Sequence, residues 1–391
     1  MAKKKINKIF VGLTAGGSGG HMYPLLAVAK SIQKTAMMNH LELDLRYFGD
    51  PGNFAKDLAD KQVKISRIAS SKWRRYFSLQ NFLDIFKFFW GIVQAMWVMY
   101  WRMPDVVFSK AGPGVVPILF VARWYNIPVV IHETDAVPGR ANYLSSKHAD
   151  LIEVAFAEVK DKFPEKVQHL VKIVGNPVRE DVLVEESREQ SRQILGVKSE
   201  KPVLLVMGGS QGAEALNYFI LENSQVLLQD FEIIHQIGKE NFDGYMAEFN
   251  FMTKNFRAEL KANYYPFAYF DGANYAHALN ACDVILSRSG GSVFEMAAHG
   301  KPAFLVPLPN SANNHQAENA YIYQSAGAGI VIEEGNLLPT LFITQLKRVL
   351  GDSDRYRKMS EAAKSFYHPN AADYIARDVL QIALKAMGVV I

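Results

Sequence analysis

The chain has 391 residues, of which 49% are hydrophobic and 21% are charged. This length suffices for two α/β domains with separate cores, and the composition excludes an intrinsically disordered chain. Its single cysteine, Cys282, excludes a disulfide framework or a zinc site built from cysteines, and the net charge of +4 without a basic helix gives no indication of nucleic-acid binding.

The first half alternates short apolar runs with helical patterns. A basic start, ending at Lys8, precedes an apolar run too short for a signal peptide, so we expect a cytoplasmic protein. Buried parallel strands are predicted over residues 9–13, 43–48, 106–109, 129–131 and 172–174, and helices over 25–34 and 115–125.

The second half repeats this alternation. Strands are predicted over residues 203–207, 232–236, 284–287 and 303–306, and helices over 213–228 and 293–299. We place the boundary after Gly175, which gives domains over 1–175 and 176–366 and a last segment over 367–391. The pattern predicts an α/β protein with two Rossmann-like domains, whose parallel sheets face each other across a cleft.

A glycine-rich turn follows the first strand of each half, at residues 16–21 and 208–213. Glycine permits close approach of a ligand to the backbone, and the following helix start offers N–H groups to a phosphate. Neither turn is the dinucleotide fingerprint. In the first turn, counted from Gly17, Met22 stands where the third glycine belongs. His21, at the start of the first helix, is either a general base or a packed turn residue.

Polar residues follow two later strands of the second half. The turn Ser289, Gly290, Gly291 and Ser292 suits a pyrophosphate, and Glu295 lies in the next helix, where its carboxylate can accept ribose hydroxyls. Gln316 and Asn319 are three residues apart on one helix face and can bind sugar hydroxyls. Each feature alone is compatible with helix capping, but together they favour a nucleotide-sugar site.

Six ordered motifs then resemble those of the MurG family: GGSGGH at 16–21, HETDAVPGRAN at 132–142, GNPVR at 175–179, GGSQGA at 208–213, SRSGGSVFE at 287–295 and HQAENA at 315–320. The resemblance implies a GT-B glycosyltransferase fold and transfer of N-acetylglucosamine from UDP-GlcNAc to lipid I, which gives lipid II. UDP-GlcNAc is then a substrate, and no cofactor or metal is implied. It also implies a peripheral enzyme on the inner face of the cell membrane, and a last helix over 371–387 that returns to the first domain.

The resemblance also assigns residues to the site. Ser210, Gln211 and Arg179 are expected at the donor nucleotide, Glu295 at the ribose, Gln316 and Asn319 at the GlcNAc hydroxyls, and Phe270 near the uracil. Ser18, Gly19, Gly20 and His21 are expected near the donor sugar and the acceptor.

The chain departs from the family pattern at a few positions. Asp135 and Thr134 stand where the family usually has Asn and Gln, Arg140 replaces an apolar residue, and the 288–295 segment is one residue shorter than usual. The resemblance implies an inverting displacement, for which we expect His21 as the base, with Asp135 as the alternative and a donor contact. The only Asp-x-Asp, at 352–354, fits helix capping better than a metal site.

One long apolar segment indicates contact with a membrane. Residues 82–101 are rich in Phe, Trp and Met, with Asp84, Lys87, Gly91 and Gln94 on a narrow polar stripe. We expect a partly exposed amphipathic helix at an anionic membrane surface, and a fully buried helix is the alternative. The expected membrane contacts are Lys72, Trp73, Arg74, Arg75 and Phe77.

Other functions stay open from the sequence. A diacylglycerol glycosyltransferase that uses a UDP-hexose and a UDP-GlcNAc 2-epimerase share the expected architecture. A non-catalytic UDP-sugar-binding protein is the alternative outside the enzymes, and the missing third glycine disfavours a nicotinamide-dependent dehydrogenase.

Overall fold

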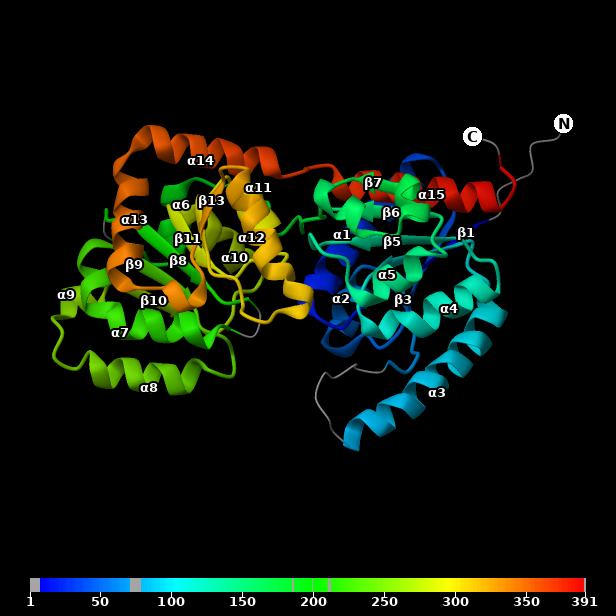
Figure 1. Cartoon of the computed structure of the whole chain (residues 1–391), viewed down its shortest axis with the longest axis horizontal. Coiled ribbons are helices and arrows are strands. Elements are labelled where there is room, and N and C mark those ends of the chain that lie inside the picture. Colours follow the sequence, from blue (N-terminus) through cyan, green and yellow to red (C-terminus); the bar gives the residue numbers. More distant parts are fainter. Residues whose placement is uncertain (1–7, 71–78, 185, 199, 210–211, 390–391) are drawn as a thin grey trace. The chain divides into compact units, whose positions relative to one another are not determined.

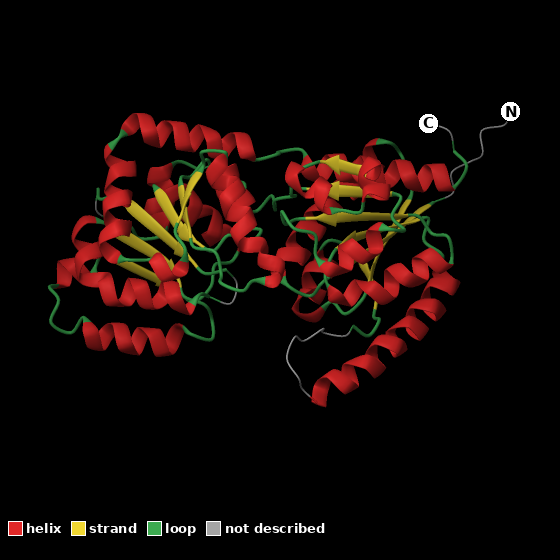
Figure 2. Ribbon diagram, viewed as in Figure 1, coloured by secondary structure: helices red, strands yellow, loops and turns green. Residues whose placement is uncertain are grey.

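Each half of the computed structural model is built on its own parallel sheet with helices on both faces (Figures 1 and 2). The structure describes residues 8–70, 79–184, 186–198, 200–209 and 212–389. Within this part of the chain, unit 1 runs to Arg179 and resumes at His368, and unit 2 is Glu180–Tyr367. The predicted α/β class with two parallel-sheet domains is confirmed.

The sheet of unit 1 has seven strands in the order β3-β2-β1-β4-β5-β6-β7, and all its pairs are parallel. The strands are β1 (Ile9–Ala15), β2 (Leu43–Phe48), β3 (Lys64–Ser66), β4 (Val106–Lys110), β5 (Val129–Glu133), β6 (Leu151–Val154) and β7 (Val171–Ile173). The direction of strand addition reverses between β1 and β4, and ligands of open parallel sheets bind at the carboxyl ends beside such a reversal.

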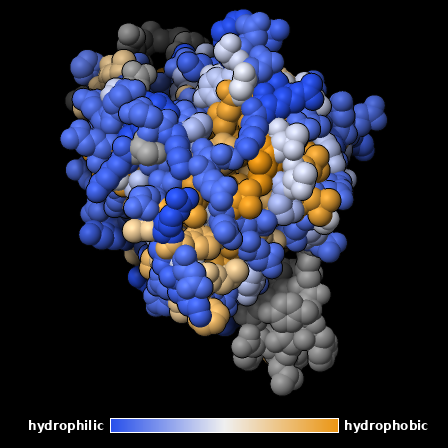
Figure 3. Space-filling view, turned by 90° about the vertical axis from the view of Figure 1, so that its left-hand side faces the viewer, coloured by the Kyte–Doolittle hydropathy of each residue, from blue (hydrophilic) through white to orange (hydrophobic). Residues whose placement is uncertain are grey.

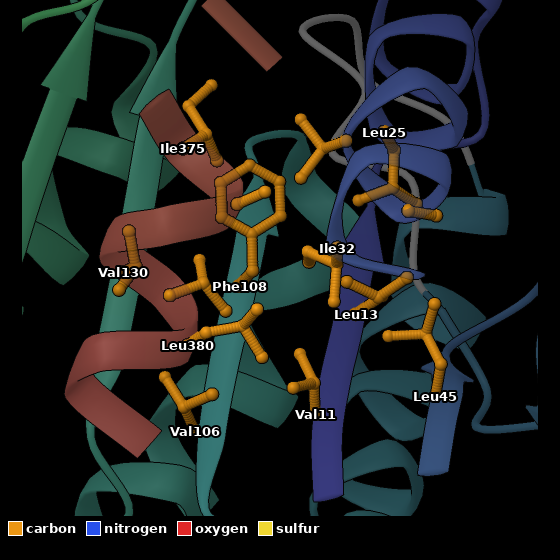
Figure 4. Close-up of a cluster of buried hydrophobic side chains, with 14 of the residues drawn as sticks. Val11, Leu13, Leu25, Ile32, Leu45, Val106, Phe108, Val130, Ile375 and Leu380 are labelled. Atoms are coloured by element: carbon orange, nitrogen blue, oxygen red, sulfur yellow. The ribbon is translucent and has the colours of Figure 1, made fainter. Parts of the chain in front are cut away.

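The helices of unit 1 include one from the far end of the chain. They are α1 (Gly19–Met38), α2 (Ala55–Asp60), α3 (Leu79–Arg102), α4 (Val116–Trp124), α5 (Arg140–Ser146) and α15 (Ala371–Ala386). Ile375 and Leu380 of α15 lie in the same buried cluster as Ile32 of α1 and Phe108 of β4 (Figure 4). The last helix therefore completes the core of unit 1 and covers β1 and β4.

The sheet of unit 2 has six parallel strands in the order β10-β9-β8-β11-β12-β13, with a reversal between β8 and β11. The strands are β8 (Val203–Met207), β9 (Glu232–Gln236), β10 (Tyr264–Phe267), β11 (Val284–Ser287), β12 (Ala303–Leu305) and β13 (Gly329–Val331). The helices are α6 (Arg188–Ile194), α7 (Glu214–Asp230), α8 (Phe242–Met252), α9 (Ala258–Lys261), α10 (Gly272–Ala281), α11 (Val293–Ala298), α12 (His315–Ser325), α13 (Pro339–Gly351) and α14 (Ser353–Phe366).

The start of α14 decides the role of the Asp-x-Asp sequence. Asp352 is the N-cap residue of α14, and its Oδ1 accepts a hydrogen bond from the Arg355 N–H at 3.0 Å. Asp354 forms an ion pair with Arg357 in the first turn. The prediction of helix capping is confirmed at Asp352.

Candidate functional site

The first glycine turn lies at the strand reversal of unit 1, directly against the turn that follows β4. The Gly16 N–H donates to the Ala111 carbonyl at 2.7 Å. Gly112 has a φ of +106°, and a Cβ there would lie 2.5 Å from the Gly16 Cα. Only glycine permits this backbone contact, so the two turns fix each other at the carboxyl edge of the sheet.

Four predicted site residues meet where α1 begins. Ser18 is the N-cap residue, and its Oγ lies 2.7 Å from Nδ1 of His21. Gly19 and Gly20 are the first two residues of the helix, and Gly20 is exposed. The structure thus brings a half-buried imidazole together with the positive end of a helix of 20 residues, an arrangement suited to an anion.

Arg179 lies in the same unit and contacts this helix near its start. Its guanidinium carbon is 4.0 Å from the ring centroid of Tyr23, which makes an edge contact with Phe54. The sequence analysis expected Arg179 at the donor nucleotide, and it missed Tyr23 as the aromatic surface on which the guanidinium stacks.

A buried carboxylate organises the loop between β5 and α5. Glu133 accepts hydrogen bonds from the Asp135 N–H at 3.1 Å, the Gly139 N–H at 2.9 Å and the Asn142 side-chain amide at 2.9 Å. Burial, and then the charge of Asp135, raises the pKa of Glu133. Asp135, one of the predicted site residues, is half-buried. It lies in this loop, just past the carboxyl end of β5.

A fully buried lysine lies beneath this loop, and the sequence analysis missed it. Lys110 ends β4, and its Nζ lies 2.5 Å from His132 Nδ1, 3.0 Å from Asn176 Oδ1, and within hydrogen-bond distance of Thr134 Oγ1. Burial lowers the pKa of Lys110 to about 7, against the opposing charges of nearby carboxylates. Burial also holds the pKa of His132 well below its usual value, so this imidazole is neutral.

The second glycine turn follows β8 and requires glycine for similar reasons. Gly212 has a φ of +83°, and a Cβ there would lie 2.1 Å from the Ile237 carbonyl oxygen. The Gln236 side-chain amide donates to the Gly209 carbonyl at 2.8 Å and ties the turn to the end of β9. The predicted donor residues Ser210 and Gln211 lie outside the described residues.

Two further predicted segments of unit 2 are bonded to each other. The Ser289 hydroxyl donates to the Gln316 carbonyl at 2.7 Å, and the Asn319 side-chain amide donates to the Ser289 carbonyl at 3.0 Å. The Gln316 side-chain oxygen accepts from the Leu308 N–H at 2.9 Å. Ser289 and Asn319 are fully buried, so their side chains join the β11–α11 turn to α12.

The remaining predicted residues of this unit lie on and around α11. Gly290, Gly291 and Ser292 lead into the helix and are half-buried. Glu295, also half-buried, accepts a hydrogen bond from the Tyr275 hydroxyl at 3.0 Å. Phe270 is buried and stacks on the Tyr275 ring with a centroid distance of 6.2 Å. Tyr275 thus links the residues predicted for the ribose and the uracil, and the sequence analysis missed it.

The predicted amphipathic helix is α3, and its apolar side faces outward. Gly91 lies so close to the Ala69 carbonyl that a Cβ would be 2.5 Å from the oxygen, and Gln94 Oε1 accepts from the Ala69 N–H at 2.8 Å. The exposed residues are Phe86, Phe89, Trp90, Val93, Met96, Trp97, Tyr100 and Trp101. The alternative of a fully buried helix was therefore wrong, because the inward face is made by Gly91, Gln94, Ala95 and Met99 and leaves the aromatic residues exposed.

Three further observations concern the predicted membrane region and the surface of the protein. Lys72, Trp73, Arg74, Arg75 and Phe77 lie outside the described residues. Across the described chain, no helix combines the length and hydropathy needed to cross a membrane. The face of the protein seen in Figure 3 is mainly hydrophilic, with smaller hydrophobic areas between the polar side chains.

Sequence comparison assigns both halves to one family. The Glycosyltransferase family 28 N-terminal domain matches residues 11–153, and its C-terminal domain matches residues 203–375. A UDP-N-acetylglucosamine–N-acetylmuramyl-(pentapeptide) pyrophosphoryl-undecaprenol N-acetylglucosamine transferase from Clostridium kluyveri is 34% identical over 86% of this chain and 90% of its own. The protein of the same name from Treponema denticola is 32% identical over 94% of this chain and 96% of its own.

Solved structures agree with this assignment. The MurG structure from Acinetobacter baumannii has a TM-score of 0.72 at 27% identity and covers 95% of this chain and 99% of its own. A UDP-GlcNAc 2-epimerase from Neisseria meningitidis bound to UDP-GlcNAc has a TM-score of 0.66 at 16% identity, over 95% of this chain and 99% of its own. The second likeness shows a shared fold only.

Proposed function

The chain belongs to the MurG family of glycosyltransferases, and from this premise we propose that it transfers N-acetylglucosamine from UDP-GlcNAc to the MurNAc 4-hydroxyl of lipid I, giving lipid II. The observation that carries the proposal is the similarity to transferases of this name over nearly the full length of both chains. The glycine turns support it, since both lie at strand reversals, where parallel sheets bind ligands.

Unit 2 is the donor domain in this proposal. Glu295 would accept the ribose hydroxyls, next to an aromatic pair of Phe270 and Tyr275 that suits the uracil. The half-buried Gly290, Gly291 and Ser292 would approach the diphosphate, as would Ser210 and Gln211. Gln316 and Asn319 would bind the GlcNAc hydroxyls from α12, which the hydrogen bonds of Ser289 join to the β11–α11 turn.

Unit 1 supplies the base and stabilises the leaving group. In the tautomer in which His21 Nδ1–H donates to Ser18 Oγ, its Nε2 carries the lone pair that accepts the proton of the acceptor hydroxyl. The oxygen attacks the anomeric carbon from the face opposite UDP, the bond to the diphosphate breaks, and the α-linked donor gives a β-linked product. The start of α1, at Ser18, Gly19 and Gly20, and the Arg179 guanidinium favour the negative charge that develops on UDP.

Asp135 is the alternative base. It lies past the carboxyl end of β5, and its N–H donates to Glu133, which fixes the backbone of the loop. Its carboxylate could also contact the donor, and the His21 and Asp135 variants discussed below distinguish the two bases.

The outward side of α3 supports docking at the inner face of the cell membrane. Trp97 and Trp101 are 67% and 66% exposed, and they lie on one helix with other exposed aromatic residues. Large exposed apolar surfaces mark interaction sites, and aromatic residues are suited to the lipid interface. The basic segment at Lys72, Arg74 and Arg75, with Trp73 and Phe77, would add attraction to anionic lipids.

The test of this function is a matrix of two donors and two acceptors. Radiolabelled UDP-GlcNAc or UDP-glucose is incubated with a lipid I analogue or with diacylglycerol, and the lipid products are separated. We expect label in lipid only when UDP-GlcNAc is combined with the lipid I analogue. Label transferred from UDP-glucose to diacylglycerol would favour the diacylglycerol glycosyltransferase, and binding of UDP-GlcNAc without transfer to either acceptor would favour a binding protein.

A further inference from the structure

Lys110 is an unusual residue for its place in the fold. It is the last residue of β4, at the strand reversal of unit 1, and its side chain is fully buried. A buried ammonium loses its hydration and is found only where the protein replaces those hydrogen bonds. Its surroundings therefore indicate what the lysine does.

Three acceptors surround the three hydrogens of this ammonium. They are His132 Nδ1 at 2.5 Å, Asn176 Oδ1 at 3.0 Å, and the Thr134 hydroxyl oxygen. His132 Nε2 lies 2.8 Å from the Gly175 carbonyl, an acceptor only, so Nε2 carries the ring proton and Nδ1 is the acceptor that Lys110 needs. The three contacts are mutually consistent and use the full donor capacity of a protonated lysine.

These contacts join three segments that are distant in sequence. Lys110 ends β4, His132 and Thr134 lie at the end of β5, and Asn176 follows β7. Thr134 is also the residue immediately before Asp135. The ammonium thus holds one side of the β5–α5 loop, while Glu133 holds the other through the Asp135 and Gly139 N–H groups.

The charges around Lys110 fit this role. Burial has the largest effect on the pKa of Lys110 and lowers it, and the charges of Glu133 and Asp135 from β5 and its loop, and of Glu153 from β6, oppose this effect. His132 is the titratable group in direct contact, and it is neutral because burial and the neighbouring ammonium lower its pKa. A protonated Lys110 therefore lies near the carboxyl groups of this loop and of β6.

We propose that Lys110 is a positioning residue of the transfer reaction, whose ammonium holds Thr134 and His132 so that the loop carrying Asp135 keeps the conformation used in catalysis. This inference rests on the proposed function where it is tested by kinetics. Its second test, hydrogen–deuterium exchange of the loop, does not depend on that function. Lys110 is fully buried and is not one of the residues assigned to a substrate, so its removal should lower kcat and leave donor binding, for which most of the assigned residues belong to unit 2, nearly unchanged.

The test uses Lys110→Met, which keeps the apolar stem without the charge, Thr134→Val, which removes one acceptor at nearly constant volume, and their double variant. Lys172→Met is the matched control, because Lys172 belongs to the same sheet and pairs with Asp378 but is exposed. We expect Lys110→Met to lower kcat at least tenfold with the KM for UDP-GlcNAc within twofold. We expect a smaller loss for Thr134→Val, and a double variant no worse than Lys110→Met, because the loop is already released.

Hydrogen–deuterium exchange of residues 134–139 provides a readout independent of activity. We expect faster exchange in Lys110→Met than in the wild type or Lys172→Met, with the β1 segment unchanged. A folded Lys110→Met with kcat and loop exchange within twofold of wild type would overturn the inference. If Lys110→Met does not fold, Thr134→Val decides, since unchanged kcat and exchange in that variant would equally overturn it. A wild type without transferase activity would instead count against the proposed function, and the exchange comparison would still test the lysine.

Discussion

At the residue scale, the chemistry depends on a few side chains held at the carboxyl edge of the unit 1 sheet. His21 is bonded to Ser18 at the start of α1, and Asp135 lies in the β5–α5 loop, whose backbone Glu133 holds. The sequence indicated both residues, because each lies in a short motif beside a predicted strand end. Both residues are candidates for the base because of their positions, and substituting each in turn distinguishes them.

His21→Ala and His21→Gln should lower kcat by about 100-fold or more, because loss of a general base typically costs 10² to 10⁴ in rate. Donor affinity should stay within a few-fold of wild type, since His21 is assigned to the acceptor hydroxyl and most donor residues are assigned to unit 2. Steady-state kinetics and calorimetric titration with UDP-GlcNAc measure the two quantities. His148→Gln, at an exposed histidine of the same unit, is the control. Near-normal turnover in the His21 variants, with a large loss in Asp135→Asn, would identify Asp135 as the base.

Lys110 also predicts a pH dependence of stability. Its pKa is about 7 in the folded protein, below its ordinary value of 10.5, so between these values the unfolded chain binds more protons than the folded one. The free energy of unfolding contributed by this group therefore rises with pH across that window. Lys110→Met lacks this contribution, so its stability relative to wild type should fall as pH rises from about 7 to 9.5. Urea denaturation at several pH values measures it, and a pH-independent difference would contradict it.

Lys110 also shows what the sequence could not reveal. A lysine after an apolar run resembles the solvated end of a strand, and its burial depends on β5 and the 174–176 segment. Tyr23 and Tyr275 were missed for the same reason, because their partners Arg179 and Glu295 are distant in sequence. Contacts of this range depend on the fold and not on local periodicity.

At the element scale, most inner strands were predictable, and of the edge strands only β7 was predicted, over residues 172–174. The strands predicted over 43–48, 203–207, 232–236 and 284–287 have these bounds in the structure. The strands β3, β10 and β13 lie at sheet edges, are short, and are half-buried or exposed at most positions, so they lack a continuous apolar run. β6 was missed because the charged Glu153 interrupts its apolar pattern, although this side chain is buried.

Helix α3 is the element whose orientation is hardest to predict from its hydrophobic pattern. The predicted amphipathic helix exists, but Gly91 and Gln94 contact the Ala69 backbone, and the aromatic residues face outward. A Cβ at position 91 would lie 2.5 Å from the Ala69 carbonyl oxygen, so the inward position of Gly91 follows from sterics. Part of the apolar arc, with Ala95 and Met99, is buried in the core, and its aromatic part is left exposed.

Replacing Trp90, Trp97 and Trp101 together by serine should weaken binding to anionic vesicles by about tenfold or more, because burial of one large apolar side chain contributes roughly 1.5–3 kcal/mol. Vesicle sedimentation with and without anionic lipid measures the partition. Phe251→Ser with Met252→Ser, at exposed residues of α8 in unit 2, is the matched control. Equal binding by the two variants, or binding by the wild type that does not depend on anionic lipid, would count against the assigned membrane surface.

At the scale of the whole molecule, two sheets of similar topology each place a glycine turn at a strand reversal, and the chain returns through α15 to complete the first core. Parallel sheets require covering helices and long crossovers, so the alternation of elements was sufficient to predict the fold class. The chemistry of the donor and acceptor came instead from the order of six motifs. The similarity of the chain to transferases over nearly its full length connects this fold with the reaction.

The most direct measurement is the structure of the lipid product, determined by NMR and mass spectrometry after incubation of the purified protein with UDP-GlcNAc and a lipid I analogue. Inverting transfer to the acceptor predicts a single new sugar, β-linked to the 4-hydroxyl of MurNAc, with UDP released in equal amount. An α-linked product, a linkage to another hydroxyl, or UDP release without a new glycosidic bond would contradict the account.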